Sequence, residues 1–133
     1  ISLSVDKVAY LDQQVSMLHP SATLVDEFLR LNPKSSQFDA YSKLARFDFK
    51  NRLAEKKVSD LSGGERMRAG LVICLMSDQS PQLMLLDEPT NHLDLRSILA
   101  IENMLNCYQG AVIAVSHDME FLENIGVARR LRL

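Results

Sequence analysis

The sequence has no apolar run long enough to cross a membrane. A membrane-spanning helix needs about 20 predominantly apolar residues, whereas the most apolar runs, Leu71–Met76 and Leu83–Leu86, are short and flanked by polar residues. No basic region followed by an apolar stretch and a cleavage site precedes the first strand-like segment. We therefore expect no membrane insertion and a cytoplasmic location.

Cysteine is scarce as well. The two cysteines, Cys74 and Cys107, have no CxxC spacing and no histidine arranged beside them for metal binding. Both lie in apolar helical patterns, so we expect two buried free thiols in a reducing compartment.

Net charge is small, at −2, but it is unevenly distributed. The stretch from Arg30 to Arg68 has 10 Lys and Arg against 5 Asp and Glu (+5), and the rest of the chain has 5 against 12 (−7). The basic stretch could face nucleic acid, or it could be a solvated helical face rich in lysine. Charge alone leaves both interpretations open.

The chain is expected to contain three parts: 1–21, a strand and a loop; 22–60, a small helical subdomain; and 61–133, where strands and helices alternate. In the last part an apolar strand at 82–86 ends in Asp87 and Glu88, and a second buried strand at 111–115 precedes His117. Such alternation predicts an α/β fold with a parallel sheet. The remaining expected elements are a strand at 7–11, helices at 23–32, 37–47, 62–76, 95–108 (ended by Gly110) and 119–125, and a final strand at 127–133.

Polar side chains follow three of the expected strands. They are Gln13, the pair Asp87 and Glu88, and His117. Parallel sheets bind ligands outside the carboxyl ends of their strands, so these groups should converge. An aspartate at the end of an apolar strand is suited to Mg²⁺ in phosphoryl transfer, and an adjacent glutamate can orient or deprotonate the attacking water.

The segment Leu61–Glu65 predicts a second kind of anion site. Ser62 and Glu65 have the S-x-x-E spacing of a capping box, and Gly63 and Gly64 let the backbone approach a ligand closely. A capped helix N-terminus presents N–H groups and partial positive charge to a phosphate. Alone, such a motif is more often only a helix start.

The combination of motifs, in this order, resembles the ABC ATPase domain over nearly the whole chain. Leu61–Glu65 (LSGGE) resembles the family's signature, and Leu83–Glu88 (LMLLDE) its Walker B strand. The stretch Asp87–Asp94 (DEPTNHLD) is similar to the form in the ABC-F branch, whose members carry two ATPase domains and no transmembrane domain. The match also places Gln13 (with Gln14 as competitor) in the Q-loop, Asp94 in the D-loop and His117 at the switch position.

The resemblance implies a partial P-loop NTPase (RecA-like) sheet plus a helical subdomain, with ATP and Mg²⁺ as cofactors. It implies Gln13 and Asp87 on the Mg²⁺ shell, Glu88 as the base for water, and His117 on the γ-phosphate. Ser62, Gly63, Gly64 and Glu65 would hold a nucleotide bound by a second ATPase domain in a head-to-tail arrangement, and Asp94 would link the two sites.

The departure from the family is the phosphate-binding loop. No G-x-x-x-x-G-K-[ST] exists, because the only glycines are Gly63, Gly64, Gly70, Gly110 and Gly126. The chain also begins with Ile1 rather than Met. We expect a fragment cut inside the domain, active only in its intact parent, with a naturally degenerate ATPase as the alternative.

Three functions are compatible with these motifs. The first is an ATPase of the ABC-F branch, linked by resemblance to the ribosome, translation and antibiotic protection. The second is the ATP-binding subunit of a membrane transporter, and the third is a non-catalytic interaction module. The sheet edge left by missing strands could also let the fragment self-associate.

Overall fold

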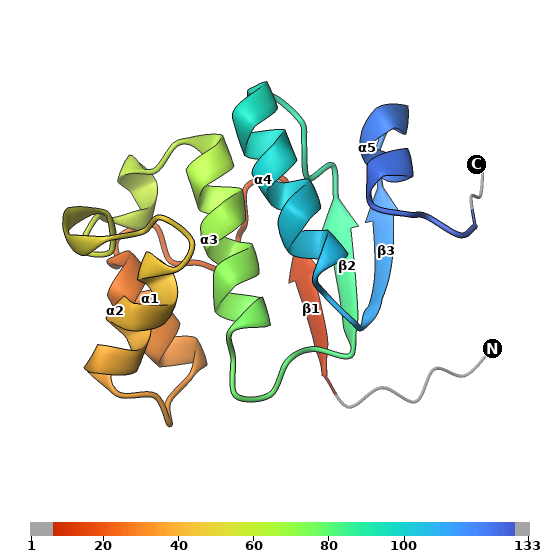
Figure 1. Ribbon diagram of the computed structural model, residues 1–133. Coiled ribbons are helices and arrows are strands. Elements are labelled where there is room, and N and C mark those ends of the chain that lie inside the picture. Colours follow the sequence, from red (N-terminus) through yellow and green to blue (C-terminus); the bar gives the residue numbers. More distant parts are fainter. Residues whose placement is uncertain (1–6, 130–133) are drawn as a thin grey trace.

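The computed structural model describes residues 7–129 and contains a parallel sheet of three strands (Figure 1). The strand order is β1-β2-β3, and Leu11, Leu86 and Ala114 lie side by side across the sheet. All three carboxyl ends therefore point to the same edge. The strands are β1 (Val8–Leu11), β2 (Leu83–Asp87) and β3 (Ala111–Val115).

Helices lie on one face of the sheet and beside it. Figure 1 shows α3 between the sheet and the two helices α1 and α2, with α4 in front of the sheet and α5 at the upper end of β3. None of the helices in residues 7–129 has the length and apolarity that crossing a bilayer needs. The helices are α1 (Leu24–Leu31), α2 (Gln37–Ala45), α3 (Gly63–Leu75), α4 (Leu95–Asn106) and α5 (Met119–Asn124), with 3-10 turns at Asn51–Leu53 and Val58–Asp60.

The segment 22–60 is closed by backbone contacts between its two ends. An isolated bridge joins Thr23 to Lys57, and the Val25 N–H donates to the Ala54 carbonyl at 2.9 Å. The Thr23 side chain caps α1 by accepting from the Asp26 N–H. The segment is thus a helical unit packed against α3, and its role as a separate subdomain stays a prediction.

The core lies between the sheet and the helices. On the covered face, Leu11, Met84 and Leu86 are at most 1% exposed, and Ile101 of α4 and Phe121 of α5 pack in the same cluster. Burying such side chains is the main favourable term in folding. This cluster joins the sheet to α3, α4 and α5.

The prediction that β3 is a buried strand was wrong. Its alternate residues Ile113 and Val115 are 52% and 59% exposed, because β3 is an edge strand and no described element covers that face of the sheet. Val8 and Tyr10 of β1 are exposed on the same face. We call Val8, Tyr10, Ile113 and Val115 the open face.

Two predicted element ends also differ. Helix α4 stops at Asn106 rather than Tyr108, because the Tyr108 hydroxyl donates to the Pro81 carbonyl and the chain leaves the helix. Gly110 does not end the helix; a Cβ there would collide with the Tyr108 ring. The predicted strand at 127–133 is absent over 127–129, where the chain closes the turn after α5, and 130–133 lie outside the described residues.

The two thiols are not equivalent. Cys107 is exposed, contrary to the prediction, because it follows the last turn of α4. Cys74 lies half-buried on α3, and burial raises the pKa of its thiol to about 11. Cys74 therefore stays protonated and packs as a small apolar side chain.

Candidate functional site

The acidic pair lies where β2 ends. Asp87 is the last residue of β2, and the Glu88 N–H donates to the Val115 carbonyl of β3 at 2.8 Å. His117 follows β3, and its Nε2 lies 3.5 Å from the Glu88 Oε1. The His117 side chain is 99% exposed and that of Glu88 23%, so the carboxylate is held by the fold while the imidazole is open to an incoming ligand.

Glu88 has a strained backbone. Its φ is +49°, a left-handed conformation that costs a residue with a side chain about 1 kcal/mol or more. The turn after it is closed by the Asn91 N–H, which donates to the Glu88 carbonyl at 3.2 Å. His92, at φ +61°, shapes the next turn. Strain of this kind concentrates at functional sites, where the surroundings over-determine it.

A polar cavity of about 500 Å³ opens beside Glu88. The Thr90 hydroxyl lies 3.4 Å from Asp118 Oδ2, and the other oxygen of Asp118 accepts from the Phe121 N–H to cap α5. Sequence analysis missed Thr90 and Asp118, although both lie inside the stretches that carried the motifs. The cavity is lined by Glu88, Thr90, Asn91, His92, His117 and Asp118.

Asp87 is approached by Tyr10 rather than by Gln13. The Tyr10 hydroxyl donates to Asp87 Oδ2 at 3.4 Å across neighbouring strands. Partial loss of water around the phenol and the charges of Asp87 and Asp12 raise the pKa of Tyr10, so it stays a donor. Sequence reasoning also missed Tyr10, because its contact with Asp87 depends on the register of two parallel strands.

Gln13 lies exposed in the turn after β1. The turn is closed by the Val15 N–H donating to the Asp12 carbonyl at 3.0 Å, and the Ser16 N–H donates to Asp12 Oδ1 at 2.6 Å. Burial alone would raise the pKa of Asp12, but the hydrogen bonds that its carboxylate accepts from the Ser16 hydroxyl and the Ser16 N–H outweigh this effect and lower the pKa. The turn presents Gln13 and Gln14 at the same edge of the sheet as Asp87.

The start of α3 has the expected capping box. The Ser62 Oγ accepts from the Glu65 N–H at 3.1 Å, and Glu65 Oε1 accepts from the Ser62 N–H at 2.9 Å. The hydrogen bond from the Ser62 backbone lowers the pKa of Glu65. The N–H groups of Gly63 and Gly64, at the first two helical positions, have no intrahelical acceptor. Ser62 and Gly63 are exposed, and Gly64 is buried.

The N-terminus of α3 contacts the loop before α4 rather than the cavity. A Cβ at Gly63 would lie 3.5 Å from the Leu93 side chain, and Asp94, the N-cap residue of α4, lies beside Gly64. None of Ser62, Gly63, Gly64 and Glu65 lines the cavity beside Glu88. The site residues thus form two groups, one lining the cavity and one beside the loop before α4.

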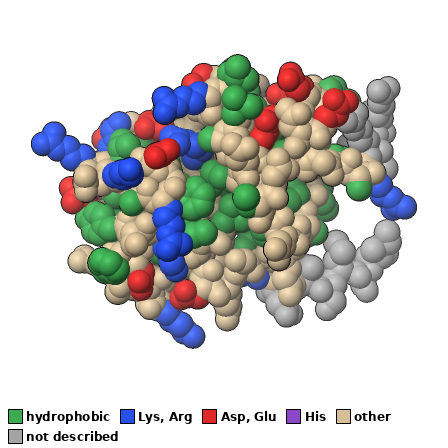
Figure 2. All heavy atoms as spheres, viewed as in Figure 1, with side chains coloured by type: hydrophobic (Ala, Val, Ile, Leu, Met, Phe, Trp, Pro, Cys, Tyr) green, Lys and Arg blue, Asp and Glu red, His purple; other side chains and the backbone are tan. Residues whose placement is uncertain are grey.

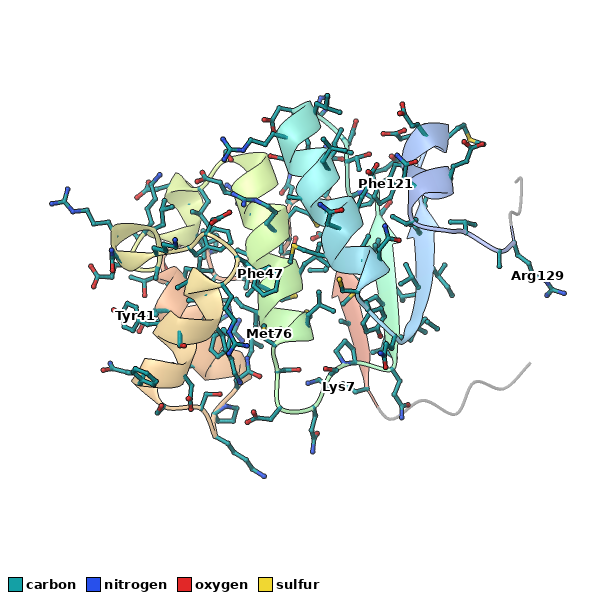
Figure 3. The ribbon with its side chains drawn as sticks, viewed as in Figure 1. Lys7, Tyr41, Phe47, Met76, Phe121 and Arg129 are labelled. Carbon is teal, nitrogen blue, oxygen red and sulfur yellow. The ribbon has the colours of Figure 1, made fainter. Side chains whose placement is uncertain are left out.

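A larger cleft of about 600 Å³ lies near the amino ends of β2 and β3, away from their carboxyl ends. Its lining is mostly apolar and comes from the last turns of α3 and α4 on one side and from Arg46 and Phe47 on the other. Figure 3 shows two of these residues, Phe47 and Met76, beside α3. It brings together no acid and base of the kind that Glu88 and His117 form. The smaller polar cavity is therefore the candidate site.

The fold and the carboxylate pair at a strand end define a part of an α/β nucleotide-binding domain. The chain belongs to the family described as ABC transporter, whose model matches residues 2–91. Among solved structures, it is similar to the ATP-binding cassette MJ0796 dimer bound to ADP and Pi, with TM-score 0.68 and 26% identity over 90% of this chain and 56% of that one. This confirms the predicted fold class.

Two curated relatives indicate the branch of this family to which the chain belongs. The chain is 42% identical to the probable ATP-binding protein YheS of Escherichia coli K12 over 80% of its length, and 41% identical to the energy-dependent translational throttle protein EttA of Mycobacterium tuberculosis H37Rv over 77%. Both are ABC-F proteins, which confirms the expected branch. The chain spans only 16% and 19% of these relatives.

Proposed function

We propose that this chain is the downstream part of an ATP-hydrolysing domain in an ABC-F protein that acts in translation. The observation that carries the proposal is Glu88, held in a strained turn at the end of β2 with the His117 imidazole 3.5 Å away. A carboxylate fixed in this way can accept a proton from an attacking water, while the exposed histidine can contact the terminal phosphate.

Asp87 and Gln13 fit a magnesium site. Mg²⁺ in phosphoryl-transfer sites uses one or two carboxylates together with phosphate and water, and Asp87 supplies a half-exposed carboxylate already oriented by the Tyr10 hydroxyl. When bound, the ion would neutralise charge on the phosphates. Gln13, in its hydrogen-bonded turn at the same sheet edge, would orient water around the ion.

The second group of residues supports a head-to-tail partner domain. Ser62 and Gly63 are exposed and lie outside the cavity that contains Glu88, and the N–H of Gly63, at the first helical position, has no intrahelical acceptor. We infer that Ser62, Gly63, Gly64, Glu65 and Asp94 serve a nucleotide held by a second ATPase domain. The similar ATP-binding cassette MJ0796 is a dimer in its complex with ADP and Pi, which supports a second domain as the partner.

The partner in translation is proposed from the relatives and from charge. EttA is named a translational throttle protein, and exposed cations on the helical segment include Arg46, Lys50, Arg52 and Lys57. Figure 2 shows most Lys and Arg side chains of this view over that segment. Such a surface favours contact with the phosphates of ribosomal RNA.

One experiment, in the full-length protein that contains this chain, tests both the proposed ATP hydrolysis and the proposed ribosome binding. Glu88→Gln keeps the shape of the side chain but removes the base, so ATP turnover should fall by about 10²- to 10⁴-fold while ATP binding is retained. The variant held with ATP should co-sediment with ribosomes. Glu120→Gln, an exposed carboxylate on α5, is the control; equal turnover in Glu88→Gln and wild type would remove Glu88 from this role.

A further inference from the structure

Gly64 and Gly63 are glycines for different reasons. A Cβ placed on Gly64 would lie 2.7 Å from the Cβ of Ser97, and nearer still to the Ser97 hydroxyl oxygen. A Cβ on Gly63 would meet only the Leu93 side chain, at an ordinary 3.5 Å. The Ser97 Cβ is attached directly to the backbone of α4, so a change of the Ser97 rotamer cannot move it away. A side chain at position 64 would therefore require a shift of the backbone.

Ser97 also contacts the loop that precedes α4. Asp94 is the N-cap residue, its carbonyl accepts from the Ile98 N–H at 3.1 Å, and the Ser97 hydroxyl lowers the pKa of the Asp94 carboxyl. The side chain of Asp94 nonetheless makes no capping hydrogen bond with good geometry. Asp94 Oδ1 lies 3.8 Å from the Cβ position of Gly64, so Ser97, Asp94 and Gly64 form one small contact.

We propose that Ser97 is a positioning residue that fixes the N-terminus of α3 to the loop before α4 through Gly64. The exposed groups at Ser62 and Gly63 and the carboxylate of Asp94 are then presented to the partner domain as one rigid surface. The inference rests on the proposed function and adds to it a residue outside the motifs, together with a reason for Gly64 within this chain.

Two explanations of Gly64 predict opposite results in a double variant. If Gly64 is glycine so that its backbone can approach a phosphate of the partner's nucleotide, an alanine there is harmful whatever occupies position 97. If Gly64 is glycine because Ser97 fills the space of its side chain, removing the Ser97 side chain makes room for the alanine. Interacting residues reveal themselves by such non-additivity.

The test uses four variants of the full-length protein that contains this chain. Gly64→Ala should lower kcat for ATP about tenfold or more, the effect of overpacking a fixed contact, and leave KM within about twofold because Asp87 and Glu88 are untouched. Ser97→Gly alone loosens the contact and should cost about threefold. The double variant Gly64→Ala/Ser97→Gly should match Ser97→Gly, whereas Gly64→Ala/Ser97→Ala, which keeps the Cβ, should stay as low as Gly64→Ala.

Hydrogen exchange without nucleotide provides a readout independent of turnover. Gly64→Ala should raise exchange in both 63–66 and 94–98, and Ser97→Gly should restore protection at 63–66 in the double variant. Failure of Ser97→Gly to rescue, or a harmless Gly64→Ala, would overturn the inference. A wild-type turnover that is insensitive to Glu88→Gln would instead overturn the proposed function, while the exchange data would still decide the contact.

Discussion

At the scale of single residues, Ser62 and Glu65 determine where α3 begins and also make its stability depend on pH. The hydrogen bond from the Ser62 N–H stabilises the charged form of Glu65 and lowers its pKa below the ordinary 4.5. A depressed carboxyl pKa contributes stability above the unfolded value and loses it as pH falls through the folded value.

The expected result is a pH-dependent difference between wild type and Glu65→Gln. The amide keeps a cap acceptor but not the charge, so wild type should unfold at higher urea near pH 7, and the difference should shrink as pH falls below about 4.5. Urea titrations of the chain at several pH values measure this. Glu120→Gln serves as the control, and a difference that does not change with pH would contradict the assignment.

At the scale of elements, α3 packs against the turn that carries Gln13. A Cβ at Gly70 would lie 2.7 Å from Val15 Cγ1 and 3.0 Å from Leu11 Cδ2. Val15 is 1% exposed and has φ +53°, an unusual conformation for a β-branched residue. The missing side chain of Gly70 therefore makes room for a strained turn, and the position of Gln13 depends on α3.

Gly70→Leu should destabilise the fold, because the gain in helix propensity of about 1 kcal/mol is smaller than the overpacking of a full leucine side chain. We expect a lower free energy of unfolding by about 1–3 kcal/mol, measured by urea denaturation. Arg96→Leu, which adds leucine at an exposed position of α4, should change stability little. Equal stability of the two variants would show that the turn at Val15 rearranges to accommodate the leucine and that the contact with Gly70 is not tightly packed.

At the scale of the whole molecule, the chain has an acidic site but no phosphate-binding loop. Such loops surround the phosphates with backbone N–H groups and a lysine, whereas Asp87 and Glu88 present two carboxylates to a polyphosphate. Like charges at this range disfavour binding unless a cation intervenes. The 133 residues alone should therefore bind Mg-ATP poorly and not hydrolyse it.

Calorimetry and a phosphate-release assay on the purified chain test this expectation. Wild type and Asp87→Ala should both show weak binding without saturation at micromolar ATP. Micromolar binding lost in Asp87→Ala, or steady turnover lost in Glu88→Gln, would show that these residues suffice without the loop.

The open face predicts self-association of the isolated chain. Its exposed apolar residues lie beside the edge of β3, with which no other strand in residues 7–129 pairs, and such surfaces associate with other copies. Ile113→Lys should lower the sedimentation coefficient at high concentration without loss of secondary structure. Leu99→Lys, a similarly exposed residue on α4, is the matched control; equal sedimentation of all three proteins would exclude the open face as the contact.

Sequence alone determined the features that depend on neighbouring residues or on strand direction. The S-x-x-E spacing specified the capping box at Ser62, because both hydrogen bonds span three residues. The apolar run before Asp87 and Glu88 specified a strand with an acidic carboxyl end. Parallel alternation then placed His117 at the same edge, since all parallel strands end on one side.

Tertiary structure alone decided the contacts between distant segments. Ile113 and Val115 have the composition of a buried strand, but their exposure depends on whether another element covers that face. Tyr10 reaches Asp87 because of the β1–β2 register, and Gly64 meets Ser97 because of how closely α3 approaches α4. Such distances follow from the packing of the whole core, which no local pattern of residues specifies.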